Sequence, residues 1–189
     1  MKYLFFLITL IVTSVPQQDF YMRLSDAAIS LINPTIEYDS HYTQIPYPNG
    51  DVAKDKGVCT DVVIRAYRKL GIDLQKEVHE DMIANFSKYP KLWGLKTTDT
   101  NIDHRRVPNL QTFFTRKGKS LPATQNAADY KPGDVVTWLL DNNLTHIGVI
   151  VNKKGVNGRN KVVHNIGHGQ VCEDVLFEYK ITGHYRYKK

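Results

Sequence analysis

The strongest constraint on the fold is a change in residue pattern near Lys131. Before it, apolar side chains recur at helical spacing, and after it β-branched and aromatic runs alternate with turn-rich stretches. The pattern predicts helices over 20–32, 60–70, 73–86 and 108–117, followed by strands over 134–140, 146–152, 161–166 and 181–187. Helices first and antiparallel strands second predict an α+β fold, and 189 residues suffice for one domain with its own core.

The N-terminus predicts where the protein works. Lys2 gives a short positive region, an apolar run covers 3–12, and Val12 and Ser14 suit a cleavage site. The run is shorter than the roughly 20 residues that cross a bilayer, which favours a cleaved secretory signal over the alternative, an uncleaved anchor. We therefore expect export to the periplasm or beyond, with no stable membrane span after cleavage. The expected division is a signal peptide over 1–14, an N-terminal helix within 15–34 and one domain over 35–189.

Charge and motifs narrow the partners and cofactors. The formal net charge of +6 favours an anionic neighbour, whether nucleic acid, an acidic membrane surface or a cell-wall polymer. No nucleic-acid motif accompanies the charge, and export argues against that partner. His164 and His168 are four residues apart but flanked by glycines, and no His-Glu-x-x-His or paired Cys-x-x-Cys occurs. We expect no metal and no cofactor, and the oligomeric state stays open.

Cys59 is the candidate nucleophile because it directly precedes a predicted helix. The positive end of the helix dipole and the unpaired N–H groups of the first turn favour a thiolate there, and the same groups can stabilise an oxyanion. The alternatives are a buried small side chain and a disulfide with Cys172, which an oxidising compartment permits. Cys172 itself lies among polar and acidic neighbours, with nothing to activate it.

A thiol nucleophile needs a base, and imidazole suits that task near neutral pH. His146 and His164 both lie in predicted strands. If these strands are hairpin neighbours, the two rings share a face in one parity of the register and are separated in the other. His146 is then the candidate base and His164 its orienting partner, although Asn165 is an alternative orienter, as Asn is in papain-like proteases.

Four short segments follow one another along the chain: Gly57-Val-Cys-Thr-Asp61, Pro132-Gly-Asp-Val-Val136, Thr145-His-Ile-Gly-Val149 and Val163-His-Asn165. Their order resembles that seen in NlpC-type cell-wall peptidases. The chain resembles these papain-like cysteine enzymes, which carry the Cys on a helix and the His on a strand. Tyr47, 12 residues before Cys59, resembles in its spacing the tyrosine that those enzymes place beside the oxyanion.

A closer resemblance, over nearly all of residues 35–187, is to the bacterial domain of unknown function 1287 family. It includes the segments Asn101-Ile-Asp-His-Arg-Arg-Val-Pro-Asn-Leu110 and Ile181-Thr-Gly-His-Tyr-Arg186. The resemblance implies a papain-like fold, N-terminal helices with a helix-borne Cys packed on a C-terminal antiparallel sheet. It also implies Cys59 as nucleophile, His146 as base and His164 as third member. Thr60-Asp61 departs from the Ser-Gly that usually follows the NlpC-type cysteine.

His104, Arg105 and Arg106 form a cationic segment between two predicted helices. Guanidinium groups bind carboxylates and phosphates bidentately, so the segment is a candidate clamp for a substrate anion. The simpler interpretation is a solvated turn capped by Asp103. Asp61, next to the candidate nucleophile, is placed with the clamp as a candidate substrate-binding residue.

Three functional hypotheses remain from the sequence. The first is an exported cysteine peptidase or amidase that cleaves cell-wall peptides through an acyl-enzyme. The second is a cell-envelope binding module of the same fold without turnover. The third keeps the Cys-His chemistry but hydrolyses an acyl ester.

Overall fold

The computed structural model describes residues 19–189, so the predicted signal peptide lies outside the described residues. Its four α-helices all lie before the main run of strands. They are α1 (Phe20–Ile29), α2 (Cys59–Lys69), α3 (Leu74–Asn85) and α4 (Val107–Lys117), and short 3-10 helices cover Phe86–Lys88, Asp103–Arg105 and Ala127–Asp129. Within the described chain, no helix combines the length and apolar character needed to span a membrane.

The helix boundaries follow local side-chain chemistry. α3 starts where Asp73 accepts a hydrogen bond from the Gln75 N–H, within one residue of the start predicted from the sequence. The first helix was expected to run to residue 32, and this is wrong because α1 ends at Ile29. The Ser30 hydroxyl bonds to the Ala27 carbonyl at 2.7 Å. The chain then turns, and Asn33 pairs with Gln170 as an isolated β-bridge.

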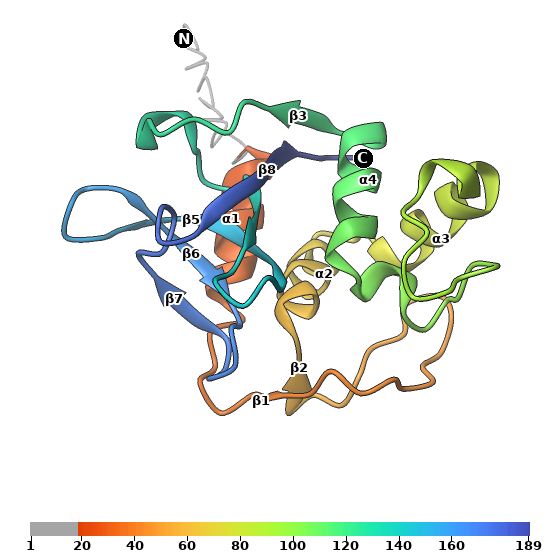
Figure 1. The fold of residues 1–189 in the computed structure, drawn as a ribbon. Coiled ribbons are helices and arrows are strands. Elements are labelled where there is room, and N and C mark those ends of the chain that lie inside the picture. Colours follow the sequence, from red (N-terminus) through yellow and green to blue (C-terminus); the bar gives the residue numbers. More distant parts are fainter. Residues whose placement is uncertain (1–18) are drawn as a thin grey trace, which may run out of the picture.

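A six-stranded antiparallel sheet forms the second half of the fold, in the order β3-β8-β4-β5-β6-β7 (Figure 1). Its strands are β3 (Lys119–Leu121), β4 (Val135–Leu139), β5 (Thr145–Lys154), β6 (Asn160–His164), β7 (Val171–Glu173) and β8 (Lys180–Arg186). The four longer strands agree with the predicted ones, whereas β3 and β7 are too short to show a pattern. The α+β prediction is therefore confirmed.

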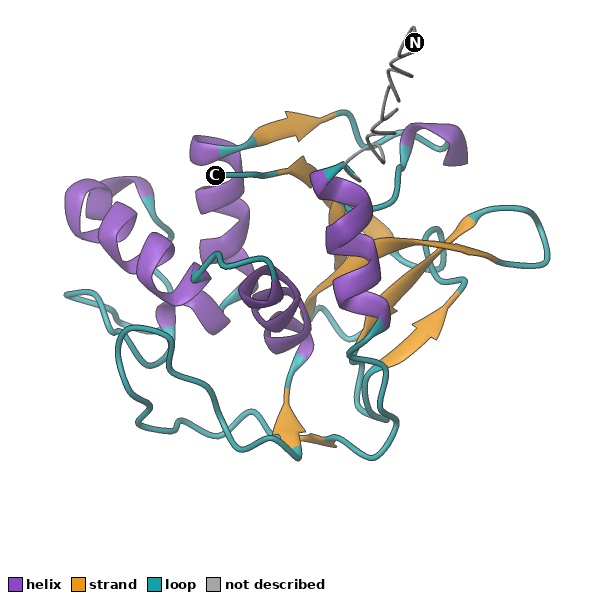
Figure 2. Cartoon of the chain, turned by 180° about the vertical axis from the view of Figure 1, so that it is seen from behind, coloured by secondary structure: helices purple, strands orange, loops and turns teal. Residues whose placement is uncertain are grey.

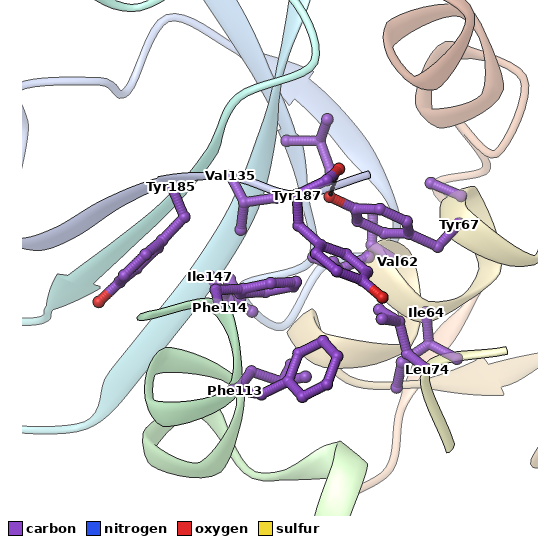
Figure 3. Close-up of a cluster of buried hydrophobic side chains, with 14 of the residues drawn as sticks. Val62, Ile64, Tyr67, Leu74, Phe113, Phe114, Val135, Ile147, Tyr185 and Tyr187 are labelled. Atoms are coloured by element: carbon purple, nitrogen blue, oxygen red, sulfur yellow. Dashed lines mark hydrogen bonds between the residues drawn. The ribbon is translucent and has the colours of Figure 1, made fainter. Parts of the chain in front are cut away.

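The two faces of the sheet have separate cores. Helices α1 and α2 pack on one face, whose buried residues include Ile147, Val149 and Val163, and the helices gather on that side in Figure 2. Figure 3 shows Tyr67 of α2 and Phe114 of α4 meeting Tyr187 in this core. A smaller core covers the other face, made by Tyr130, Val136, Trp138, Ile150, Val162 and Leu176.

One buried carboxylate joins two of the sequence motifs. Asp134, fully buried at the start of β4, accepts hydrogen bonds from the Lys131 N–H, from His184 at 2.7 Å and from Arg186. His184 also bonds to the Pro122 carbonyl through its other ring nitrogen. The Pro-Gly-Asp and Gly-His-Tyr-Arg segments therefore hold β4, β8 and the chain after β3 together, remote from Cys59 in the sequence.

Candidate active site

Cys59 is the first residue of α2 and is 4% exposed. The start of the helix is fixed by Asp61, whose carboxylate accepts the Val58 N–H at 2.7 Å. A carboxylate in the first helical turn satisfies an N–H that lacks an intrahelical partner. Asp61 thus fixes the backbone on which Cys59 is carried.

The Cys59 sulfur lies against the backbone of β5. It accepts a hydrogen bond from Ile147, the residue after His146. Ile147 is free to make this bond because β6 pairs with β5 only from Val149 onward. Among residues 19–189 no hydrogen bond joins the sulfur to an imidazole, so the thiol touches the strand beside His146 rather than its ring.

Burial raises the pKa of the Cys59 thiol to about 12. The neighbouring Asp61 carboxylate raises it further, whereas hydrogen bonds from Ile147, Thr60 and Cys59 itself lower it. The expectation that the helix terminus favours a thiolate is therefore wrong for the resting protein. The loss of hydration on burial outweighs the helix dipole, and Cys59 rests as a neutral thiol.

Tyr38, rather than Tyr47, is the tyrosine beside the nucleophile. A short strand, β1 (Glu37–Tyr38), pairs in parallel with β2 (Lys56–Gly57), and this pairing crosses the chain just before α2 (Figure 1). The Tyr38 hydroxyl donates a hydrogen bond to the Cys59 sulfur. Tyr47 instead packs its ring edge-on against His79, 5.2 Å between centroids, because the chain from 39 to 55 loops away towards α3.

Strand register brings the two candidate histidines together. His146 and His164 lie on adjacent strands, and a 2.9 Å hydrogen bond joins Nε2 of His146 and Nδ1 of His164. Val149 pairs with Val163, so Gly148 lies opposite His164. A Cβ on Gly148 would lie 2.6 Å from a Val162 methyl and 3.1 Å from the His164 Cβ. Glycine is therefore required there for the close packing of the second ring.

A carboxylate completes this arrangement. Nε2 of His164 lies 3.0 Å from the Glu173 carboxylate of β7. Burial lowers the pKa of His146 to about 3 and also lowers that of His164. Both imidazoles are therefore neutral in the resting protein near pH 7. Sequence reasoning missed Glu173, because a three-residue strand carries no periodic signal.

The remaining predicted residues divide into structural and accessible ones. Asn165 donates to the Gly57 carbonyl at 3.3 Å, so it holds the segment before Cys59 and does not orient His146. Arg105 forms a bidentate ion pair with Asp61, both bonds at 2.9 Å, and neither side chain is more than 3% exposed. Asp61 and Arg105 thus neutralise each other. Arg105 is not free to bind a substrate anion, and Asp61 is not free to contact a substrate. Burial lowers the pKa of His104 to about 3, so that ring is uncharged.

Arg106 remains as the cation of the predicted clamp. Its guanidinium stacks on the Trp93 ring at 4.2 Å, and its Nη1 is buried without a hydrogen-bond partner. Both side chains line a pocket of about 200 Å³ that also contains Cys59. A second pocket of about 330 Å³ contains His146, and Tyr38 and Thr145 line both. Nucleophile and candidate base therefore face adjoining hollows separated by two side chains.

The described chain contains no group of three or more His, Cys, Asp or Glu side chains arranged to hold a metal ion.

Residues 25–187 match the family described as domain of unknown function DUF1287. The chain belongs to the DUF1287 family. A curated relative, "Uncharacterized protein YijF" of Escherichia coli strain K12, is 52% identical over 166 residues, which cover 88% of this chain and 81% of the relative.

Solved structures show how the DUF1287 fold relates to others. NlpC1 from Trichomonas vaginalis superposes with a TM-score of 0.50 and 16% identity over 93% of this chain, which spans only 47% of that protein. An N-acetylmuramoyl-L-alanine amidase from Bacteroides uniformis gives a TM-score of 0.51 and 13% identity, covering 89% of this chain and 99% of the amidase. The predicted papain-like, NlpC-type fold is confirmed.

The raised pKa of Cys59 predicts how its thiol reacts. A group with a pKa of about 12 is almost entirely protonated at pH 7.5, and only the thiolate is alkylated. We expect Cys59 in the folded protein to react with iodoacetamide at least about 100-fold more slowly than an unperturbed thiol of pKa about 8.5. Peptide mass spectrometry over a time course measures this. Half-exposed Cys172 is the internal comparison, and faster labelling of Cys59 than of Cys172 would contradict the prediction.

Proposed function

We propose that this DUF1287 protein is an exported cysteine hydrolase that cleaves amide bonds of cell-wall peptides through an acyl-enzyme. One observation carries the proposal: the helix-borne Cys59 contacts β5 one residue from His146, whose ring is held by His164. The shared fold with NlpC1 and the amidase agrees with this chemistry. The +6 charge suits an anionic wall polymer.

The reaction requires one proton to move out and back. Because His164 occupies Nε2 of His146, the nitrogen left for the thiol is Nδ1, which lies on the backbone side of the ring. His146 takes the thiol proton there as the sulfur attacks the carbonyl carbon. N–H groups of Ile147 and the first turn of α2 stabilise the oxyanion. The proton passes to the leaving amine, and water then hydrolyses the thioester.

Access to Cys59 requires Tyr38 to release the sulfur. The thiol is 4% exposed and holds the Tyr38 hydroxyl, so a substrate carbonyl must replace this contact. The same sealed thiol favours the second candidate, a wall-binding module without turnover. A Cys59–Cys172 disulfide, which would support that candidate further, is not formed, since both cysteines are free.

Incubation of the purified protein with muropeptides and with acyl esters tests the proposal. Liquid chromatography with mass spectrometry should detect new peptide fragments and a Cys59-linked acyl adduct in a brief quench. Cleavage of esters alone would favour the acyl-ester hydrolase, and binding without cleavage would favour the non-catalytic module. Either result would overturn the peptidase proposal.

Arg106 is proposed as the residue that selects a carboxylate next to the scissile amide. It has an unpartnered buried Nη1 in the Cys59 pocket, and burial lowers its pKa although the nearby Asp103 and Asp99 carboxylates act in the opposite direction. Arg106→Gln should lower kcat/KM by about 10- to 100-fold on a wall peptide with a free carboxylate there. The same peptide bearing a primary amide should be affected less than about threefold.

A charge-matched control separates this role from general electrostatics. Arg23 is exposed on α1, and Arg23→Gln removes the same charge without touching the pocket. Equal losses on acid and amide peptides in Arg106→Gln would contradict a carboxylate contact. Equal losses in both variants would show that only net charge matters.

A further inference from the structure

Glu173 is the end of a hydrogen-bonded chain that leads to the candidate base. It pairs with Nε2 of His164 at 3.0 Å, and Nδ1 of His164 pairs with Nε2 of His146 at 2.9 Å. Both rings are buried, at 1% and 3% exposure, whereas the Glu173 side chain is 39% exposed. The chain therefore runs from the surface at β7 through β6 to β5.

The direction of each hydrogen bond follows from the chemistry of its ends. A carboxylate only accepts, so Nε2 of His164 carries a proton. The neutral ring has one N–H, so its Nδ1 has a lone pair and accepts from Nε2 of His146. The neutral His146 ring then has no proton on Nδ1. The Glu173 carboxylate thus determines the tautomer of His164, and His164 in turn determines the tautomer of His146.

We propose that Glu173 is a positioning residue that fixes the tautomer of His146 through His164, leaving Nδ1 of His146 free to accept the Cys59 proton. Without the carboxylate, the inner hydrogen bond can reverse. Nδ1 of His164 would then donate to Nε2 of His146, whose proton would move to Nδ1, and a protonated Nδ1 cannot act as base. The inference rests on the proposed function for its catalytic consequence, but not for the tautomers themselves.

The other contacts of Glu173 do not give the same control. Its second carboxylate oxygen lies 3.7 Å from Nε2 of His168, which is 61% exposed. This contact lies on an exposed ring and makes no hydrogen bond to His164 or His146, so it does not determine where their protons lie. His168→Asn should therefore leave the tautomers unchanged. The variant therefore serves as a control that removes a contact of Glu173 without changing its hydrogen bond to His164.

Nitrogen-15 correlation spectra of labelled protein at neutral pH measure the tautomers directly. The wild type should show His146 and His164 each protonated on Nε2, with assignments made from His146→Gln and His164→Gln. Glu173→Gln keeps the shape but can either accept from or donate to His164, so both rings should become tautomer mixtures. Glu173→Ala should do the same, and Glu178→Gln, an equal charge change at an exposed site, should have no effect.

Kinetics with a cleaved peptide complete the test. In Glu173→Gln we expect kcat to fall at least about tenfold with KM changed less than about twofold, because the base is affected and the binding pocket is not. A wild type with His146 protonated on Nδ1, or unchanged tautomers in both Glu173 variants, would overturn the inference. If no peptide is cleaved, the proposed function fails, and the spectra still decide whether Glu173 sets the tautomers.

Discussion

Replacing Cys59 by alanine is expected to abolish hydrolysis, with a loss of at least about 10³-fold in kcat. The reason is that the acyl-enzyme cannot form without the sulfur, and no other thiol lies in the pocket that Arg106 and Trp93 line. The fold should persist, because a buried Cys→Ala change removes a single atom and costs about 1 kcal/mol. Turnover of muropeptides, alongside circular dichroism, measures both expectations.

Cys172→Ala is the matched control for this experiment. Cys172 lies on β7, where it pairs with Val163, and it takes no part in the hydrogen bonds that join His146, His164 and Glu173. Its activity should stay within about twofold of the wild type. More than a tenth of wild-type activity in Cys59→Ala would contradict the assignment of the nucleophile, whatever the behaviour of the control.

Arg105→Met should destabilise the fold by about 3–5 kcal/mol. Arg105 and Asp61 are joined by two hydrogen bonds of 2.9 Å with both side chains buried, so removing the guanidinium leaves a buried carboxylate with only the Val58 N–H as partner. Urea denaturation followed by tryptophan fluorescence measures the free energy of unfolding. A cost below about 1 kcal/mol would contradict a structural role for this pair.

Two comparisons make the stability prediction specific. Lys76 and Glu80 form an exposed ion pair on α3, so Lys76→Met should leave the free energy of unfolding nearly unchanged. In the double variant Arg105→Met with Asp61→Leu, neither charge is buried alone. Its stability should therefore exceed the value obtained by adding the two single losses, and strict additivity would argue against direct coupling.

The sequence predicted the helices and strands that are long enough to show their own periodic pattern of apolar residues. The helices that begin at Cys59 and Leu74 follow from apolar spacing, and the strands β4, β5, β6 and β8 follow from β-branched and aromatic runs. The sequence did not predict the short strands. The strands that carry Tyr38 and Glu173 have two and three residues, which is too few for any periodicity to appear.

The sequence also did not predict contacts between residues that are distant along the chain. Asp61 and Arg105 are 44 residues apart, and their ion pair removes both from the candidate substrate site. Tyr47 had the spacing of an oxyanion tyrosine, yet Tyr38 lies beside the thiol because β1 pairs with β2. Spacing along the chain does not specify which segment crosses a helix terminus, since that depends on pairing between distant strands.

Local periodicity and short motifs predict the α+β class, the family resemblance, a cysteine at the start of a helix and the order of the two histidines. The folded chain is needed to show that His146 and His164 share a face, that Glu173 joins them and that Cys59 rests as a sealed neutral thiol. Strand register, burial and the loss of hydration are properties of the packed chain, and no single segment contains them.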